Sequence, residues 1–240
     1  MNILLSNDDG YKSEGLKALK NVLDNYGNVT VVAPHRDISA SSSCLSVHAP
    51  VQVKKIAPNF YKIYGTPADF VHIASRGILK KTPDIVFSGV NIGSNMGDDV
   101  IYSGTVGAAI EGRHSKFGSV AISIASKNPK HTDELHLTLE HIVEHMFHKL
   151  MKQKAIMNIN IPDLPFSKLK GIKITKLGKR ELPLRASVLK KNKKNFFNIG
   201  KAGKGIPTAG NDFHAIEKGF ISITPLTIDM TNSIIYKKIK

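Results

Sequence analysis

Near the N-terminus, two apolar runs flank a segment with the periodicity of an amphipathic helix. Residues 3–6 are apolar and bounded by polar residues, and residues 29–33 are mostly β-branched, so both are predicted to be buried strands. A helix is predicted from about Ser13, a suitable N-cap residue. Its apolar positions fall on one face: Leu16, Leu19, Val22, Leu23 and Tyr26. A strand, a helix and a strand in this order predict a right-handed βαβ unit and a parallel sheet.

The alternation of strands and helices continues to about residue 161. Extended segments are predicted at 45–56 and 60–64, where they can form a hairpin. Further along, helices are predicted from Thr66 onward, over 105–116 and over about 132–151, and strands over 84–88 and 120–124. This order predicts an α/β fold with a three-layer, Rossmann-like and mostly parallel sheet.

The pattern changes after residues 162–165, where glycines and lysines replace helical periodicity. Short apolar stretches at 172–175, 196–199 and 220–224 predict strands or hairpins in this tail. The tail is interpreted as an appendage rather than a second folding unit, so the whole chain is predicted to form one domain.

The predicted domain spans residues 1–240. Its core covers about residues 1–161 and includes a returning strand near 219–225. The remaining segments, about 162–218 and 226–240, are expected to form a C-terminal appendage of a β-hairpin and helical pieces.

The chain is strongly basic, with 34 Lys and Arg against 19 Asp and Glu and a formal net charge of +15. Most of the excess lies in residues 168–204, where thirteen basic residues accompany a single acidic one, Glu181. Such a segment either binds polyanions or forms a solvated lysine-rich surface. Only Phe196 and Phe197 could stack on bases there, which is weak support for an RNA-binding module.

Composition also limits the cellular setting. No apolar run approaches the roughly 20 residues that span a bilayer, and the N-terminus lacks the basic start of a secretory signal. The single cysteine, Cys44, cannot form an internal disulfide, which is typical of a reducing compartment. We therefore expect a cytoplasmic protein without a membrane partner.

Two carboxylates, Asp8 and Asp9, come directly after the first predicted strand. Ligands of open α/β sheets bind beyond the carboxyl ends of strands. Adjacent acids at that edge repel each other unless a cation holds them, and Gly10 permits the turn that would bring both to one ion. The residues 7–10 are equally typical of a polar turn with side-chain hydrogen bonds, so both interpretations remain open.

A glycine-rich segment follows the predicted strand at 84–88. It is too long for a simple connection, and it carries the amides Asn91 and Asn95 and two further acids, Asp98 and Asp99. At its end, a helix begins with Ser103, Gly104 and Thr105. Free N–H groups and hydroxyls at a helix start can bind phosphate, although the same residues also suit a simple N-cap.

Together these motifs resemble the SurE family, the stationary-phase survival proteins that act as metal-dependent 5′/3′-nucleotidases. The resemblance is carried by residues 3–10 with Gly15, 32–34 with 39–40, 65–69, 88–93, 102–106, 212–213 and 219–226. These motifs cover nearly the whole chain in the family's order. One departure is the segment 195–198, which stands where the family has an aromatic-rich hairpin.

The resemblance implies one divalent cation per subunit, held by Asp8, Asp9, Ser39 and Asn91. Two carboxylates, a hydroxyl and an amide carbonyl are hard oxygen donors, which favour Mg²⁺ or Mn²⁺. It also implies a homodimer or homotetramer in which tail segments are exchanged through the appendage.

The leading hypothesis is hydrolysis of nucleoside 5′- and 3′-monophosphates, with some action on short polyphosphate. Asp8 and Asp9 are the expected catalytic residues, and the phosphate is expected to contact the residues Asn91, Asn95, Ser103, Gly104 and Thr105. Attack by water is expected, with a phosphorylated aspartate as the other route. The alternative hypothesis is a non-catalytic nucleic-acid-binding protein that uses residues 168–204; nucleic acid is not expected to be the main partner.

Overall fold

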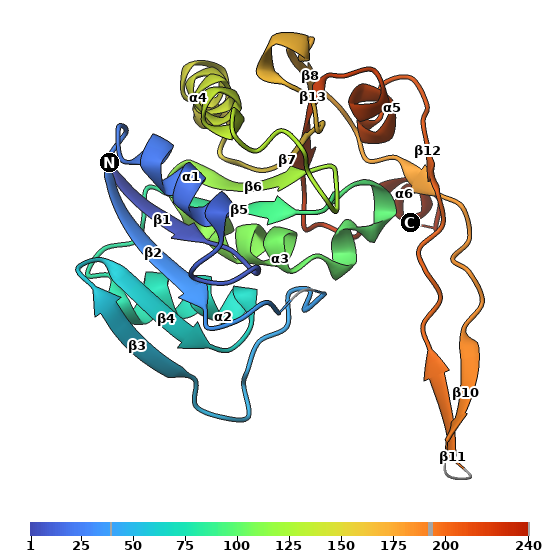
Figure 1. Cartoon of the computed structure of the whole chain (residues 1–240), viewed down its shortest axis with the longest axis horizontal. Helices are drawn as coiled ribbons and strands as arrows, with labels where there is room; N and C mark the ends of the chain where they lie inside the picture. The colour runs from blue at the N-terminus through green and yellow to red at the C-terminus, as the bar shows by residue number, and fades with distance from the viewer. Residues whose placement is uncertain (39, 192–193, 240) are drawn as a thin grey trace.

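A nine-stranded sheet runs through the centre of the molecule (Figure 1). The computed structural model describes residues 1–38, 40–191 and 194–239. The strands lie in the order β3 (Gln52–Ala57), β4 (Phe60–Tyr64), β2 (Asn28–Pro34), β1 (Asn2–Ser6), β5 (Ile85–Ile92), β6 (Gly118–Ile124), β7 (Ala155–Ile161), β13 (Ile221–Leu226) and β8 (Ile172–Ile174). Every pairing from β4 to β7 is parallel, whereas β3 and β13 run antiparallel to β4 and β7. The predicted, mostly parallel α/β sheet is confirmed.

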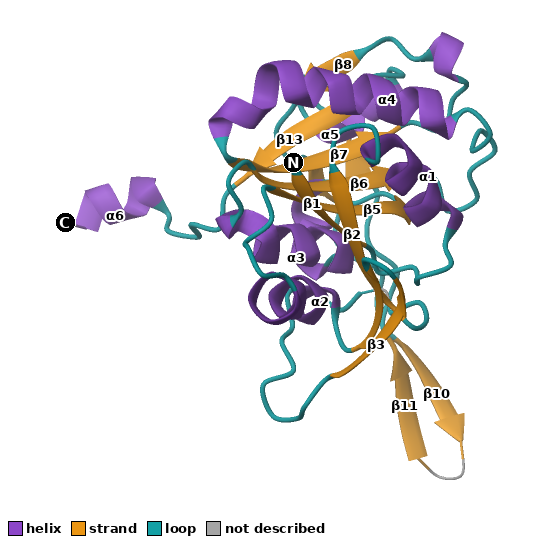
Figure 2. Cartoon of the chain, turned by 90° about the vertical axis from the view of Figure 1, so that its left-hand side faces the viewer, coloured by secondary structure: helices purple, strands orange, loops and turns teal. Residues whose placement is uncertain are grey.

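Helices cover both faces of the sheet and make three layers (Figure 2). One face carries α1 (Glu14–Leu23) and α4 (Leu135–His145), and the other carries α2 (Pro67–Ile73) and α3 (Gly104–Glu111). Successive strand residues point to opposite faces, so Ile3 and Leu5 pack with the first pair of helices while Leu4 packs with the second. The sheet is therefore buried on both sides.

The predicted βαβ unit forms as expected, because β1 and β2 are parallel neighbours joined by α1. Ser13 caps α1, and its hydroxyl accepts a hydrogen bond from the backbone N–H of Leu16 at 3.3 Å. Tyr26 lies beyond the end of α1 at Leu23, but its ring still packs on the core by stacking on Phe147 at 4.7 Å between ring centroids. This βαβ unit therefore fixes the position of the loop that follows β1.

Several boundaries differ from the predictions. β5 continues through Ile92, because Asn91 and Ile92 resume pairing with β6 after an irregularity at Gly89. At Gly89 φ is +142°, and a Cβ there would lie 2.4 Å from the Ile122 carbonyl oxygen. α3 ends at Glu111, and Gly112–His114 continue it as a short 3₁₀ turn. The part of 45–56 before Gln52 is a loop, and the predicted helix around 132–151 has its α-helical part only at Leu135–His145.

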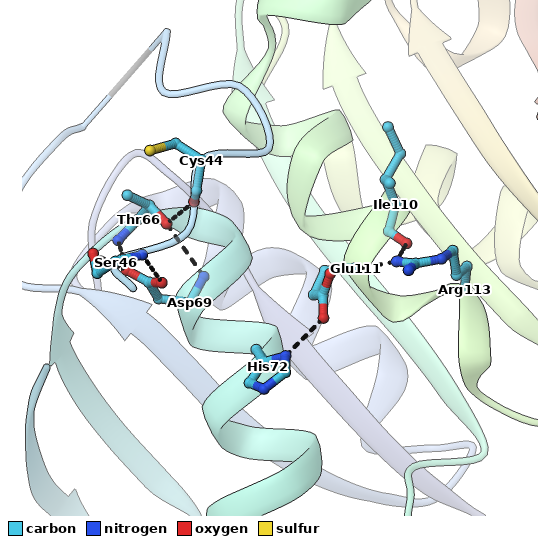
Figure 3. A network of polar contacts seen from close by, with 8 residues as sticks. All are labelled: Cys44, Ser46, Thr66, Asp69, His72, Ile110, Glu111 and Arg113. Atoms are coloured by element: carbon cyan, nitrogen blue, oxygen red, sulfur yellow. Dashed lines mark hydrogen bonds and ion pairs between the residues drawn. The ribbon is translucent and has the colours of Figure 1, made fainter. Parts of the chain in front are cut away.

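The loop before β3 is attached to the start of α2 by the Thr66 hydroxyl, which donates to the Cys44 carbonyl, and by the carboxylate of Asp69 (Figure 3). Its two oxygens accept hydrogen bonds from the Ser46 backbone and hydroxyl at 2.8 and 2.7 Å, and from the Thr66 N–H at 2.8 Å. Thr66 in turn caps α2 through the N–H of Asp69. Burial alone would raise the pKa of Asp69, but these bonds outweigh it and hold the pKa below 3.8. Asp69 therefore fixes the loop that approaches α3.

The tail extends the sheet and then leaves it. The edge strand β8 lies within the segment expected to be an appendage, and α5 (Asp212–Glu217) packs against β13. The buried Asp212 carboxylate accepts hydrogen bonds from the N–H groups of Gly97 and Gly178 at 2.7 and 2.9 Å, which joins the tail to the core. Two short strands, β9 (Lys179–Arg180) and β12 (Gly205–Ile206), pair beside it.

Two parts of the tail project from the body (Figures 1 and 2). The strands β10 (Ser187–Lys191) and β11 (Lys194–Asn198) form a hairpin, and α6 (Ser233–Ile239) lies apart from it. The remaining short helical turns are Ala74–Ile78, Gly97–Tyr102, Gly112–His114, Met146–Leu150, Met151–Gln153 and Phe166–Lys168. Among the helices of the described residues, none has the length and apolar character needed to cross a membrane.

Candidate functional site

The predicted site residues come from elements that end at one edge of the sheet. β1 and β5 are parallel neighbours, so Asp8, just past β1, and Asn91, near the end of β5, lie at the same edge. A cavity of about 350 Å³ opens there. It is lined by five of the predicted residues, Asp8, Asn91, Asn95, Ser103 and Gly104. We call it the phosphate cavity, because it is bordered by the helix start at which the sequence predicts phosphate binding.

Asp8 is buried, with 3% of its surface exposed. Its Oδ1 accepts a hydrogen bond from the Thr105 hydroxyl at 2.8 Å. A Cβ on Gly104 would lie 2.7 Å from Oδ2, so glycine at that position leaves room for the carboxylate. Burial raises the pKa of Asp8, and the bond from Thr105 offsets only part of that rise.

Asp9 lies beside the phosphate cavity rather than in its lining. Its Oδ2 accepts a hydrogen bond from the backbone N–H of Ile92 at 3.3 Å, which holds the carboxylate against the end of β5. Burial and the negative charges of Asp8 and Asp37 raise the pKa of Asp9 to about 7. Two adjacent carboxylates that disfavour ionisation in this way are stabilised by a cation.

The turn after β1 is organised by Asn7 rather than by the aspartates. The Asn7 amide donates to the Gly10 carbonyl at 3.0 Å and to the Ser13 hydroxyl at 2.8 Å. The polar turn with side-chain hydrogen bonds that the sequence suggested for residues 7–10 is therefore formed by Asn7. The carboxylates of Asp8 and Asp9 instead contact the start of α3 and the end of β5.

The side chain of Asn91 is held through its amide nitrogen. Its amide nitrogen donates to the Gly93 carbonyl at 2.8 Å, so the carbonyl oxygen is the remaining polar atom of the side chain. The donor set of Asp8, Asp9 and Asn91 consists only of hard oxygens, which fits Mg²⁺ or Mn²⁺. Within residues 1–38, 40–191 and 194–239, no group of three or more His, Cys, Asp or Glu side chains could hold a metal ion.

The fourth expected ligand, Ser39, lies outside the described residues, so its position remains a prediction. The next residue, Ala40, lines the phosphate cavity.

Asn95 is held in the phosphate cavity by polar side chains of neighbouring strands. Asn160 accepts the Asn95 N–H at 2.9 Å and donates to its carbonyl at 2.9 Å, and Asn158 donates to the same carbonyl at 2.8 Å. The Asn95 amide nitrogen donates to the Ser123 hydroxyl at 2.8 Å. Asn158 and Asn160 are fully buried on β7. The position of Asn95 is therefore set by its backbone as well as by its side chain.

The start of α3 borders the phosphate cavity. Ser103 caps the helix, and its hydroxyl accepts the Val106 N–H at 3.0 Å. Thr105 is fully buried and points its hydroxyl at Asp8 instead of into the cavity. Among the residues predicted to contact phosphate, Ser103 and Gly104 thus line the cavity while Thr105 positions Asp8.

The prediction missed four residues that the structure brings to this edge: Lys127, Tyr102, Asn158 and Asn160. Lys127 closely follows β6, so its position at a strand's carboxyl end was an available signal. The two asparagines were also visible as polar positions inside an otherwise apolar run.

Comparisons with known proteins identify the family. A family model described as survival protein SurE matches residues 3–183. The chain belongs to the SurE family. Curated relatives named 5′-nucleotidase SurE include one from Histophilus somni, 43% identical over 96% of this chain and 94% of its own length. Another, from Laribacter hongkongensis, has the same identity and coverage.

A solved SurE structure supports the same assignment over the full length. The SurE protein from Aquifex aeolicus is 38% identical, has a TM-score of 0.87, and covers 100% of this chain and 98% of its own. The SurE resemblance and the α/β architecture expected from the sequence are both confirmed.

Proposed function

We propose that this SurE-family chain is a phosphomonoesterase that removes phosphate from nucleoside monophosphates at the 5′ or the 3′ position. The curated relatives carry the name 5′-nucleotidase, which supports the coarser statement of a nucleotidase. The observation that carries the proposal is the phosphate cavity itself, where the buried carboxylate of Asp8 contacts the start of α3 and the half-buried Asp9 lies beside it. Acids and free helix N–H groups together suit a cation and a phosphate in contact.

The proposed cofactor is one Mg²⁺ or Mn²⁺ ion held by Asp8, Asp9, Asn91 and Ser39. The raised pKa values of the two aspartates and the all-oxygen donor set fit a hard cation. When bound, such an ion neutralises negative charge on the phosphate and makes water at the site more acidic.

The other residues of the cavity bind and orient the phosphate. The helix start offers the backbone N–H of Gly104 and the positive end of the α3 dipole. Lys127 is the cation of the cavity lining and adds positive charge at its rim. Asn95, held from behind by β7, keeps a polar side chain in the cavity wall.

The attacking group in this proposal is water. One of the two carboxylates, that of Asp8 beside Thr105 or that of Asp9 beside Ile92, accepts the proton of the water. A phosphorylated aspartate is the other route, but a carboxylate engaged with a cation is a weaker nucleophile.

The assembly proposed for this chain is a homodimer or homotetramer in which tail segments are exchanged. The hairpin and α6 expose apolar side chains well outside the core, including Phe197, Leu189 and Ile239. Exposed apolar segments that project from the body are stabilised when a second subunit covers them. The lysines of residues 168–204 would suit the proposed action on short polyphosphate.

The test is release of inorganic phosphate from AMP, GMP and 3′-AMP, with Mn²⁺ and with a chelator. We expect Mn²⁺-dependent release that is lost in Asp8→Asn. The matched control is Asp24→Asn, an exposed aspartate that pairs with Lys20 at the end of α1. Activity that survives the chelator or Asp8→Asn would overturn the cation-centred site. Salt-sensitive RNA binding without phosphate release would favour the nucleic-acid hypothesis instead.

A further inference from the structure

A second cavity adjoins the phosphate cavity. It has a volume of about 510 Å³ and shares two lining residues with the first, Asp99 and Tyr102. The turn Gly97–Tyr102 forms one wall, and tail residues beside β9 form the other. Its apolar lining comes from Ile101, Tyr102, Leu182, Pro183 and Ile199. We call it the side groove.

Tyr102 lies at the junction of the two cavities. It directly precedes Ser103, the cap of α3, so its side chain lies next to the start of the helix that borders the phosphate cavity. The side chain is 63% exposed, while its backbone is fixed, because the Tyr102 carbonyl accepts the Ser42 N–H at 3.2 Å. An anchored aromatic residue with an open face is a stacking surface for a planar ring.

The opposite wall of the side groove is held in place by an ion pair. Arg180 on β9 contacts Asp99 with 2.7 Å between Nε and Oδ2, and its guanidinium lies 4.9 Å from the centroid of the Phe213 ring. Because Asp99 already neutralises it, Arg180 contributes little attraction for a further anion.

The charge of the side groove distinguishes between possible occupants. Its lining holds three carboxylates, from Asp98, Asp99 and Glu181, against the single cation Arg180. A second phosphate group placed there would meet net negative charge. A neutral, planar group next to the bound phosphate meets apolar walls and an aromatic ring instead. The occupant that fits is a nucleoside.

We propose that the side groove binds the nucleoside part of the substrate, with the base stacked on Tyr102. This inference rests on the proposed function, because it assumes that the phosphate lies in the neighbouring cavity. It makes Tyr102 a specificity determinant that separates nucleotides from phosphate esters without a base, and it disfavours polyphosphates that extend along this groove.

The test compares AMP with ribose 5-phosphate, which lacks the base, in the full-length protein. In Tyr102→Ala, the ratio of kcat/KM for AMP to kcat/KM for ribose 5-phosphate is expected to fall about tenfold, the value of one base–aromatic stack. Tyr102→Phe keeps the ring and is the matched control, with the ratio close to that of the native chain. An equal loss on both substrates, or an unchanged ratio in Tyr102→Ala, would overturn the proposal.

A binding measurement keeps this proposal separate from the proposed function. Saturation-transfer NMR with adenosine, which has no phosphate to cleave, is expected to give a signal in the native chain and in Tyr102→Phe. The signal should be lost in Tyr102→Ala. Absence of phosphate release would contradict the proposed function alone, whereas adenosine binding that is undetectable in the native chain or persists in Tyr102→Ala contradicts the side-groove assignment.

Discussion

The two asparagines of β7 allow a prediction with a magnitude worked from their hydrogen bonds. Asn160→Ala removes two bonds to the Asn95 backbone, both 2.9 Å long: Oδ1 of Asn160 accepts from the Asn95 N–H, and Nδ2 of Asn160 donates to the Asn95 carbonyl. At about 1 kcal/mol each, with a part-buried N–H left without this acceptor, the free energy of unfolding should fall by about 2–3 kcal/mol. The displaced Asn95 should also raise the KM for AMP about tenfold.

Asn158→Ala is the matched variant for this prediction. It removes only one bond, because the Asn95 carbonyl still accepts from Asn160, and it also removes a buried Oδ1 that has no hydrogen-bond partner. The expected loss is therefore about 1 kcal/mol. Urea unfolding at one fixed protomer concentration measures both values. Equal losses, or a larger loss in Asn158→Ala, would refute the assignment of Asn160 as the main support of Asn95.

Two further predictions concern residues next to the site. In Gly104→Ala, the new Cβ would lie 2.7 Å from Asp8 Oδ2 and should displace the carboxylate, which should lower the rate of phosphate release from AMP about tenfold or more. The control is Gly77→Ala, whose Cβ meets nothing closer than 4.0 Å and which should keep full activity. Equal losses of activity in the two variants would contradict the steric explanation. The pKa of Asp69 is lowered, so its stabilisation is complete above pH 3.8 and is lost as the pH falls through the folded-state value. Asp69→Asn should therefore cost about 1 kcal/mol at pH 7, as the loss of a helix cap does, and clearly less at pH 3. Urea unfolding at the two pH values checks this, and a cost that does not change with pH would disprove the role of the charge.

Much of the fold could be predicted because local patterns determine it. The strand at residues 3–6, the cap at Ser13 and the apolar face of α1 are all properties of neighbouring residues. The boundary of β5 was not predictable in this way, because its extension past Gly89 depends on renewed pairing with β6. α5 was missed because it has only six residues and is fixed by Asp212, whose partners lie far away in sequence.

In the candidate site, too, features set by neighbouring residues could be predicted, and features set by distant partners could not. Asp8 and Asn91 could be placed at one edge because parallel strands present their carboxyl ends together. The sequence could not show that Thr105 bonds to Asp8, since the two lie 97 residues apart, or that Thr105 therefore lies behind the cavity wall. Asn158 and Asn160 were visible as buried polar positions, but their shared partner, Asn95, depends on the path of the chain between β5 and α3.

The central claim is that Asp8, Asp9 and Asn91 hold one hard cation at the phosphate cavity. A crystal structure of the chain soaked in Mn²⁺, with anomalous scattering to locate the ion, tests it most directly. We expect one anomalous peak within coordination distance of all three side chains, and no such peak in Asp8→Asn. A peak elsewhere in the molecule, with this site empty in the native chain, would contradict the proposed cation site.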